Sequence, residues 1–201
     1  MKRIITISRE FGSGGHSIGQ KVAEKLNLHF YDQALLEKIA QETGLSKEYI
    51  ENSEYAPARN SLLFNIVVNR SLTNYTEPSP ADMVYFAQTK IIQELAEKEP
   101  CVIVGRCSDY ILRERKDALH VFIYADLDSR SKRILERYGK NDKPILKRIE
   151  DKDARRKIYY SHYTDRPWGV LQNYHASLSS SALGEDVCVN TIVDLFQKCD
   201  G

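Results

Sequence analysis

Short continuous apolar runs and longer segments with apolar residues at helical spacing follow one another along the chain and divide it into strands and helices. Compact apolar runs predict buried strands at "RIITIS" (residues 3–8), "CVIVG" (101–105) and "ALHVFIYA" (118–125), with shorter candidates at "HFYD" (29–32) and "YHASLSS" (174–180). Apolar residues at helical spacing predict helices over 17–28, 83–98, 126–139, 142–163 and 182–198, and two more over 33–53 that break near Gly44. Strands that alternate with helices indicate an α/β fold with a mostly parallel sheet and helices on both faces.

Residues 54–82 are the least regular part of the pattern. They are polar and include Pro57, Pro78 and Pro80. We expect connections there around one helix at roughly 60–72. The whole chain of 201 residues fits a single domain with a small insertion.

The composition limits the classes of function. A net charge of +1 argues against a generally basic nucleic-acid binder, so any basic site must be local. The four cysteines show no CxxC pair and no zinc-like spacing with histidine; we expect reduced thiols, with Cys101 and Cys188 buried in strand-like runs. The apolar run near the N-terminus is too short for a signal peptide, and nothing approaches the length of a membrane span. We therefore expect a cytoplasmic protein that binds neither membrane nor nucleic acid.

The stretch "ISREFGSGGHSIG" (residues 7–19) places a glycine-rich turn between the first strand and the first helix. Unpaired amides and the positive end of a helix dipole bind phosphate at such a turn without any side chain. The predicted cradle consists of Gly12, Ser13, Gly14, Gly15, His16 and Ser17, with Ser17 as the helix N-cap. The alternative is a βα turn that binds nothing.

This turn departs from the phosphate-loop pattern G-x-x-x-x-G-K-[ST]. When the loop ends at Gly14, Arg9 stands at the first glycine, Gly15 at the lysine and His16 at the hydroxyl residue. Arg9 precedes the loop and is the candidate to fold over it and replace the lost positive charge. The hydroxyl for Mg²⁺ would have to come from Ser17, one residue late, which is about 100° further around a helix.

Positive charge gathers in one region. Residues 130–157 contain twelve lysines and arginines against five acids, a local balance of +7. Such a cluster between two helices predicts a lid over a polyphosphate; the alternative is a solvated helical hairpin with i,i+4 ion pairs. Two further candidates follow strands. Arg106, after "CVIVG", is better explained by a bound anion than by the alternative of a surface ion pair, whereas Asp32 either contacts a sugar hydroxyl or caps the next helix.

These features in this order, with "FYD", "VIVGRCSDYIL" and "NYHASLSSSALG", resemble the cytidylate-kinase-like family of P-loop proteins, which are related to nucleoside monophosphate kinases. The resemblance covers nearly the whole chain. It implies a three-layer fold with a five-stranded parallel sheet, a core of residues 1–32, 91–138 and 169–201, a helical monophosphate-binding insertion at about 33–90 and a lid at about 139–168.

The resemblance also implies an activity and its residues. Members transfer the γ-phosphoryl group of Mg·ATP to CMP or dCMP. Arg106 would lie beside the acceptor's phosphate, and Arg130, Arg133 and lid arginines such as Arg148 or Arg155 would approach the donor phosphates. Family kinases carry the Gly-Lys-Ser that this loop lacks, so two functions remain open: a nucleotide kinase that uses arginines in place of the lysine, or a non-catalytic sensor of nucleotide or phosphate.

A group of aromatic residues near the lid has two interpretations. Tyr159, Tyr160, Tyr163 and Trp168 stand close together in "KIYYSHYTDRPWG". They could stack on a base, but a lid helix that packs on the sheet also needs an apolar face, and we favour packing.

Overall fold

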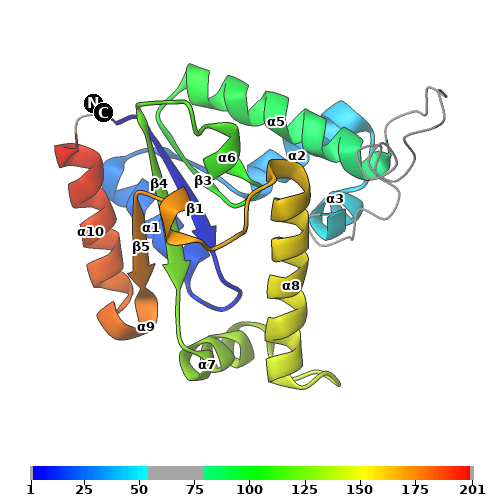
Figure 1. Cartoon of the computed structure of the whole chain (residues 1–201), viewed down its shortest axis with the longest axis vertical. Helices are drawn as coiled ribbons and strands as arrows, with labels where there is room; N and C mark the ends of the chain where they lie inside the picture. The colour runs from blue at the N-terminus through cyan, green and yellow to red at the C-terminus, as the bar shows by residue number, and fades with distance from the viewer. Residues whose placement is uncertain (1, 54–78, 200–201) are drawn as a thin grey trace.

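The computed structural model describes residues 2–53 and 79–199, and over these ranges the chain folds around an all-parallel five-stranded sheet (Figure 1). The strands are β1 (Ile4–Arg9), β2 (His29–Tyr31), β3 (Cys101–Val104), β4 (Ala118–Tyr124) and β5 (Ala176–Ser179), in the spatial order β2-β3-β1-β4-β5. This confirms the α/β class and the five-stranded sheet. Strand β1 pairs with β3 through Ile4 and Cys101 and with β4 through Ile4 and Ala118, so its carboxyl end lies at the middle of the sheet edge.

Helices cover both faces of the sheet. The described helices are α1 (Gly15–Leu26), α2 (Gln33–Thr43), α3 (Lys47–Ser53), α5 (Pro80–Lys98), α6 (Ser108–Ile111), α7 (Leu127–Tyr138), α8 (Ile145–Thr164), α9 (Ser180–Leu183) and α10 (Glu185–Lys198), with a 3₁₀ turn at Leu171–Asn173. The helix expected at 60–72, with Pro57 and Pro78, lies outside the described residues. The boundary at 90/91 between the predicted insertion and the core falls inside α5, which is one continuous helix.

The two-residue period of the strands sorts their side chains into two apolar cores. Ile5 and Ile7 point to the face where α1 and α10 pack, with Val22, Cys188 and Ile192. Ile4 and Ile103 point to the other face, where α2, α5 and the second half of α8 pack. Both faces being buried explains why these strands are continuous apolar runs rather than alternating ones.

Three details differ from the sequence-based expectations. Cys188 is buried as predicted, but it lies in α10 and not in a strand, while Cys101 lies in β3. The lid helix α8 begins at Ile145 because Pro144 precedes it, three residues later than expected. The segment predicted as the last helix contains two helices: α9 ends at Leu183, and Gly184, with a φ of 81°, separates it from α10.

The aromatic cluster packs in the core, as favoured. Tyr159, Tyr160 and Tyr163 of α8 are buried, and Trp168 packs against the same core. The ring of Tyr163 stacks on Tyr85 of α5, with centroids 4.0 Å apart and planes at 8°. These contacts anchor the second half of α8, so the charged first half of this helix projects from a fixed base.

Candidate functional site

The carboxyl ends of the strands meet at one edge of the sheet, where the structure has a cavity of about 910 Å³ that we call the main cavity. The glycine turn after β1, Asp32 after β2 and Arg106 after β3 line it, and α7 and α8 close its other side. Ligands of open α/β sheets bind at this position, and the volume lies within the range of small-molecule sites.

The glycine turn leads into an open helix start. Helix α1 begins at Gly15 with Gly14 as its N-cap, at φ 82°; no side chain caps it and its first turn contains no acid. The prediction that Ser17 is the N-cap is therefore wrong, because Gly14 takes the left-handed conformation that starts the helix two residues earlier. The first amides of an uncapped helix have no intrahelical partner, and Gly15, His16 and Ser17 of this first turn line the main cavity.

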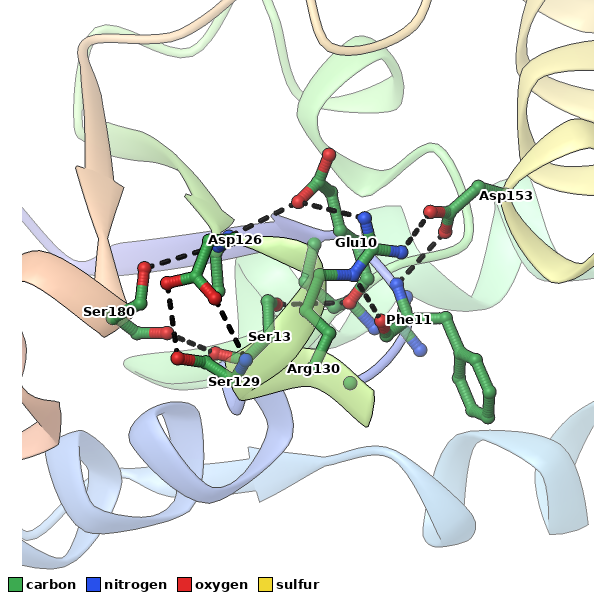
Figure 2. A network of polar contacts seen from close by, with 12 residues as sticks. Glu10, Phe11, Ser13, Asp126, Ser129, Arg130, Asp153 and Ser180 are labelled. Atoms are coloured by element: carbon green, nitrogen blue, oxygen red, sulfur yellow. Dashed lines mark hydrogen bonds and ion pairs between the residues drawn. The ribbon is translucent and has the colours of Figure 1, made fainter. Parts of the chain in front are cut away.

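Side chains hold the turn in place by donating hydrogen bonds to its carbonyl groups. Figure 2 shows part of this network. Five consecutive carbonyl oxygens accept a hydrogen bond from a side chain: Arg9 O from Arg156 (3.0 Å), Glu10 O from Ser13 Oγ (2.9 Å), Phe11 O from Arg130 Nε (2.7 Å), Gly12 O from Arg133 (3.2 Å) and Ser13 O from Ser180 Oγ (2.5 Å). Because these hydrogen bonds fix five carbonyl groups of the turn, its backbone is held in one conformation before any ligand binds.

Arg130 is the centre of this network. Its guanidinium lies between Glu10, at 3.3 Å, and Asp153 of α8, with which it forms a close ion pair (Figure 2). Asp153 also accepts a hydrogen bond from the Phe11 amide, at 2.9 Å. Arg130 is 4% exposed and does not line the main cavity, so in this structure it binds the turn and the lid helix rather than facing the cavity.

Arg9 fills the space that the lysine of a phosphate loop would need. A Cβ atom added to Gly15 would lie 2.5 Å from Arg9 Cβ, an atom that the backbone holds in place, so a larger residue at position 15 collides with the side chain at position 9. At its other end the Arg9 guanidinium crosses Gly105, where a Cβ would collide with Nη1. The side chain thus runs from the glycine turn to the end of β3, and glycine at both positions makes room for it.

His16 stands where the phosphate-loop pattern has its metal-binding hydroxyl. Its Nε2 lies 2.9 Å from Asp32 Oδ2, and its ring packs edge-on against Phe30, with centroids 5.4 Å apart. Asp32 occupies the N-cap position of α2, but its side chain makes no capping hydrogen bond. The prediction that the Asp32 side chain caps α2 is therefore wrong. Its carboxylate faces His16 instead, and both residues line the main cavity.

Arg106 is buried, at 6% exposure, with both terminal nitrogens 3.4 Å from the Ile50 carbonyl oxygen, and it lines the main cavity. It belongs to three consecutive residues with positive φ: Gly105 at 77°, Arg106 at 56° and Cys107 at 54°. A left-handed conformation costs a residue with a side chain roughly 1–2 kcal/mol. Such strain concentrates at functional sites, because the surrounding structure must hold it in place.

The structure brings most of the remaining predicted residues to the same cavity. Arg133, Arg148 and Arg155 line it; Arg133 also lies 3.6 Å from Glu185, and Arg148 donates to the Gly139 carbonyl at 2.8 Å. Ser13 is buried and outside the lining. Their assignment to donor or acceptor phosphates stays a prediction.

Sequence reasoning missed Glu10, Asp153 and Arg156. Each is an ordinary charged residue in the sequence, and each acts through a partner far along the chain: Asp153 binds Phe11 across 142 residues, and Arg156 binds Arg9 across 147. The only local signal was the density of charge in residues 130–157, which does not tell a cavity-facing arginine from a buried one.

The donor set at the cavity is compatible with a divalent cation that arrives with a nucleotide. Asp32 contributes a carboxylate, the kind of group that such cations take together with phosphate oxygens. Among residues 2–53 and 79–199, no three His, Cys, Asp or Glu side chains gather into a metal centre of their own. None of the helices in the same ranges combines the length and apolar character needed to cross a bilayer.

Comparison with solved structures identifies the fold. An uncharacterized protein from Eubacterium ventriosum ATCC 27560 superposes with a TM-score of 0.74 at 27% identity, over 98% of this chain and 100% of that one. A shikimate kinase from Acinetobacter baumannii, solved with shikimate, gives 0.54 at 13% identity over 98% and 94% of the two chains. A shikimate kinase from Bacteroides thetaiotaomicron gives 0.54 at 15% over 96% and 98%. The fold is therefore that of the P-loop kinases.

A comparison with curated protein sequences gives no match. The model of the cytidylate kinase-like family matches residues 4–182, which contain the glycine turn, Asp32, Arg106 and the whole lid region. This match spans most of the chain and includes both the strand ends and the helices α7 and α8 that line the main cavity. The protein belongs to the cytidylate kinase-like family.

Proposed function

We propose that this protein is a nucleotide kinase that transfers the γ-phosphoryl group of ATP, bound with a divalent cation, to a nucleoside monophosphate of the CMP or dCMP type. The observation that carries the proposal is the position of Arg9: its Cβ lies over Gly15 and its guanidinium reaches Gly105 at the end of β3, so it brings a permanent positive charge to the main cavity, whose loop lacks its lysine. Family membership supports the reaction class, and the CMP-like acceptor rests on the family resemblance alone.

The donor and the acceptor are proposed to bind at two different ends of the main cavity. The uncapped start of α1 suits the donor phosphates, because its amides and dipole favour negative charge. Arg106 at the end of β3 suits the acceptor's phosphate. The Arg9 side chain spans the distance between these two places and is suited to balance the charge that develops between them.

In the proposed reaction an oxygen of the acceptor's phosphate forms a bond to the γ-phosphorus, and the bond from that phosphorus to the β,γ-bridging oxygen breaks, which releases ADP. The protein has little covalent work in such a transfer; it positions the two partners and stabilises charge. Arg133, Arg148 and Arg155 line the side of the cavity formed by α7 and α8 and are proposed to contact the donor phosphates, with Arg148 on the part of α8 that can close over them.

One observation favours a second function, a sensor that binds nucleotide without turnover. His16 occupies the position of the metal-binding hydroxyl and is engaged with Asp32, so the usual oxygen ligand for Mg²⁺ is not in its usual place. A protein that keeps the anion cradle and loses metal positioning would bind ATP and transfer nothing.

The experiment that separates the two functions measures binding and turnover on the same preparation. The purified protein is titrated calorimetrically with ATP in the presence of Mg²⁺ or Mn²⁺, and ADP release is measured with a panel of nucleoside monophosphates and nucleosides. Acceptor-dependent ADP formation supports the kinase. Binding of ATP with no acceptor-dependent ADP at high protein concentration identifies the sensor and overturns the kinase proposal.

A further inference from the structure

His16 and Asp32 have the geometry of two neighbouring ligands of one metal ion. The His16 Nε2 and Asp32 Oδ2 atoms lie 2.9 Å apart. Two donors about 2.1 Å from an octahedral ion and at right angles to each other lie about 3.0 Å apart. An ion bound by both atoms would lie to one side of the line that joins them, so the imidazole ring would turn out of its hydrogen bond with the carboxylate as the ion enters.

The surroundings favour this arrangement over an incidental surface pair. Both side chains are partly buried, at 31% and 21% exposure, and both line the main cavity next to the open start of α1. Phe30 holds the His16 ring from the side. The Asp32 carboxylate, although it stands at the N-cap of α2, makes no capping hydrogen bond and faces the imidazole instead.

The donor atoms decide the class of ion. Mg²⁺ prefers oxygen ligands in a rigid octahedron, whereas imidazole nitrogen suits the first-row transition ions. We propose that the His16–Asp32 pair binds a first-row divalent transition ion of the Mn²⁺ type, which completes its coordination with phosphate oxygens of the donor nucleotide. This inference rests on the proposed function, since the nucleotide supplies the remaining ligands.

Binding requires that Nε2 of His16 presents its lone pair to the ion, so the imidazole must carry its hydrogen on Nδ1 when the ion is bound. His16 then takes over the role that a serine or threonine hydroxyl has in the usual phosphate loop, and Ser17 is not needed as a ligand. The inference thus replaces the expectation that Ser17 binds the cation.

Mn²⁺ itself is the probe for this site. Pulsed electron paramagnetic resonance on the protein with Mn²⁺ and a non-hydrolysable ATP analogue detects a nitrogen bound to the metal. The expected result is a ¹⁴N coupling in the unlabelled protein, which changes to a ¹⁵N coupling when the protein alone is ¹⁵N-labelled. This labelling separates a protein nitrogen from the nitrogens of the base.

Variants locate the nitrogen. His16→Ser should abolish the coupling and lower the Mn²⁺ affinity of the nucleotide complex at least about tenfold. His29→Ser is the matched control, because His29 also pairs with a carboxylate, Glu99 at 3.1 Å, but lies outside the main cavity. It should leave both the coupling and the affinity unchanged.

The outcomes separate this inference from the proposed function. Nucleotide binding without a protein nitrogen on Mn²⁺, or a coupling that survives His16→Ser, overturns the metal site and leaves the kinase proposal intact. Loss of Mn²⁺ affinity in Ser17→Ala but not in His16→Ser places the ion on Ser17 and also overturns it. If no nucleotide binds with Mg²⁺, with Mn²⁺ or without metal, the proposed function fails and the inference fails with it.

Discussion

At the scale of single residues, the space above Gly15 decides whether position 9 or position 15 supplies the positively charged side chain of the main cavity. Arg9 Cβ would lie 2.5 Å from a Cβ at position 15, so an arginine at position 9 and a lysine at position 15 exclude each other. This geometry explains why both positions depart together from the phosphate-loop pattern, in which position 9 is glycine and position 15 is lysine. The two substitutions are one structural change.

The exclusion predicts a coupled response to mutation. Arg9→Gly should lower the phosphoryl-transfer rate by on the order of 100- to 1000-fold, the effect of losing one preorganised donor. Gly15→Lys alone should also impair the enzyme, because the new side chain collides with Arg9. The double variant Arg9→Gly/Gly15→Lys restores the usual pattern and should recover at least about 100-fold over Arg9→Gly.

Steady-state ADP formation measures this double-mutant cycle, with thermal melting to confirm that each variant is folded. Arg113→Ala is the control, since Arg113 pairs with Glu114 and stacks on Tyr110 away from the main cavity. Equal rates for Arg9→Gly and the parent protein would show that Arg9 has no part in catalysis.

At the scale of elements, the lid helix and the glycine turn form one unit. Asp153 of α8 accepts from the Phe11 amide and pairs with Arg130 of α7, which in turn donates to the Phe11 carbonyl. The second half of α8 is fixed in the core: Tyr160 donates to the buried carboxylate of Asp109 at 2.6 Å, and burial raises the pKa of that carboxyl group. Any closure of the lid must therefore come from the residues before Asp153, where Arg148 lies.

Removal of Asp153 tests this connection. Asp153→Ala leaves Arg130 buried without its closest ion-pair partner and should reduce the free energy of unfolding by on the order of 3 kcal/mol. Urea denaturation measures it. Asp151→Ala on the same helix removes only exposed pairs with Lys143 and Lys147 and should leave the urea midpoint nearly unchanged. Equal effects of the two substitutions would mean that the buried pair does not hold the lid to the turn.

At the scale of the whole molecule, one buried histidine makes stability depend on pH. His120 in β4 is 5% exposed, lies 2.8 Å from the Thr6 hydroxyl through Nδ1, and stacks on His175 at 4.9 Å. Burial, together with the neighbouring His175 and Lys2, lowers the pKa of His120 from 6.5 to about 4. The native state therefore binds fewer protons than the unfolded state between these pH values.

The sign of the effect follows from that difference. The contribution of His120 to the free energy of unfolding is fully present above about pH 6.5. It is lost as the pH falls to about 4, which lowers the free energy of unfolding by about 3 kcal/mol in total. Urea denaturation at a series of pH values should show this slope, and His120→Asn should flatten it. His29→Asn, which changes an exposed histidine, should keep it. A slope that persists in His120→Asn would assign the acid sensitivity to other groups.

The fold could be predicted from the sequence because its signals are local. The continuous apolar runs of β1, β3 and β4 and the helical spacing in α5 each lie within one short segment, and the order of these segments determines the architecture. The glycine turn and Arg106 were found for the same reason: each directly follows a strand. Arg9 was expected to fold over the loop because it precedes it; in the structure its Cβ lies over Gly15 and its guanidinium reaches Gly105.

The contacts within the site could not be predicted in this way. The pairing of His16 with Asp32 and of Arg130 with Glu10 and Asp153 depends on how separate elements meet in space. The sequence counts Arg130 as one of twelve basic residues, whereas the structure buries it behind the turn. The N-cap assignment of Ser17 failed because Gly14 has a positive φ, which propensities do not specify.

The central claim is that a glycine turn without its lysine binds a nucleoside triphosphate through main-chain amides, with the help of the Arg9 guanidinium. Isothermal titration calorimetry of ATP with a divalent cation, on the parent protein and on Arg9→Ala, tests it most directly. The account predicts saturable heat for the parent protein and an affinity at least about tenfold weaker for the variant, as expected for the loss of a charge-assisted contact. No heat with the parent protein, or the same affinity for both, would contradict it.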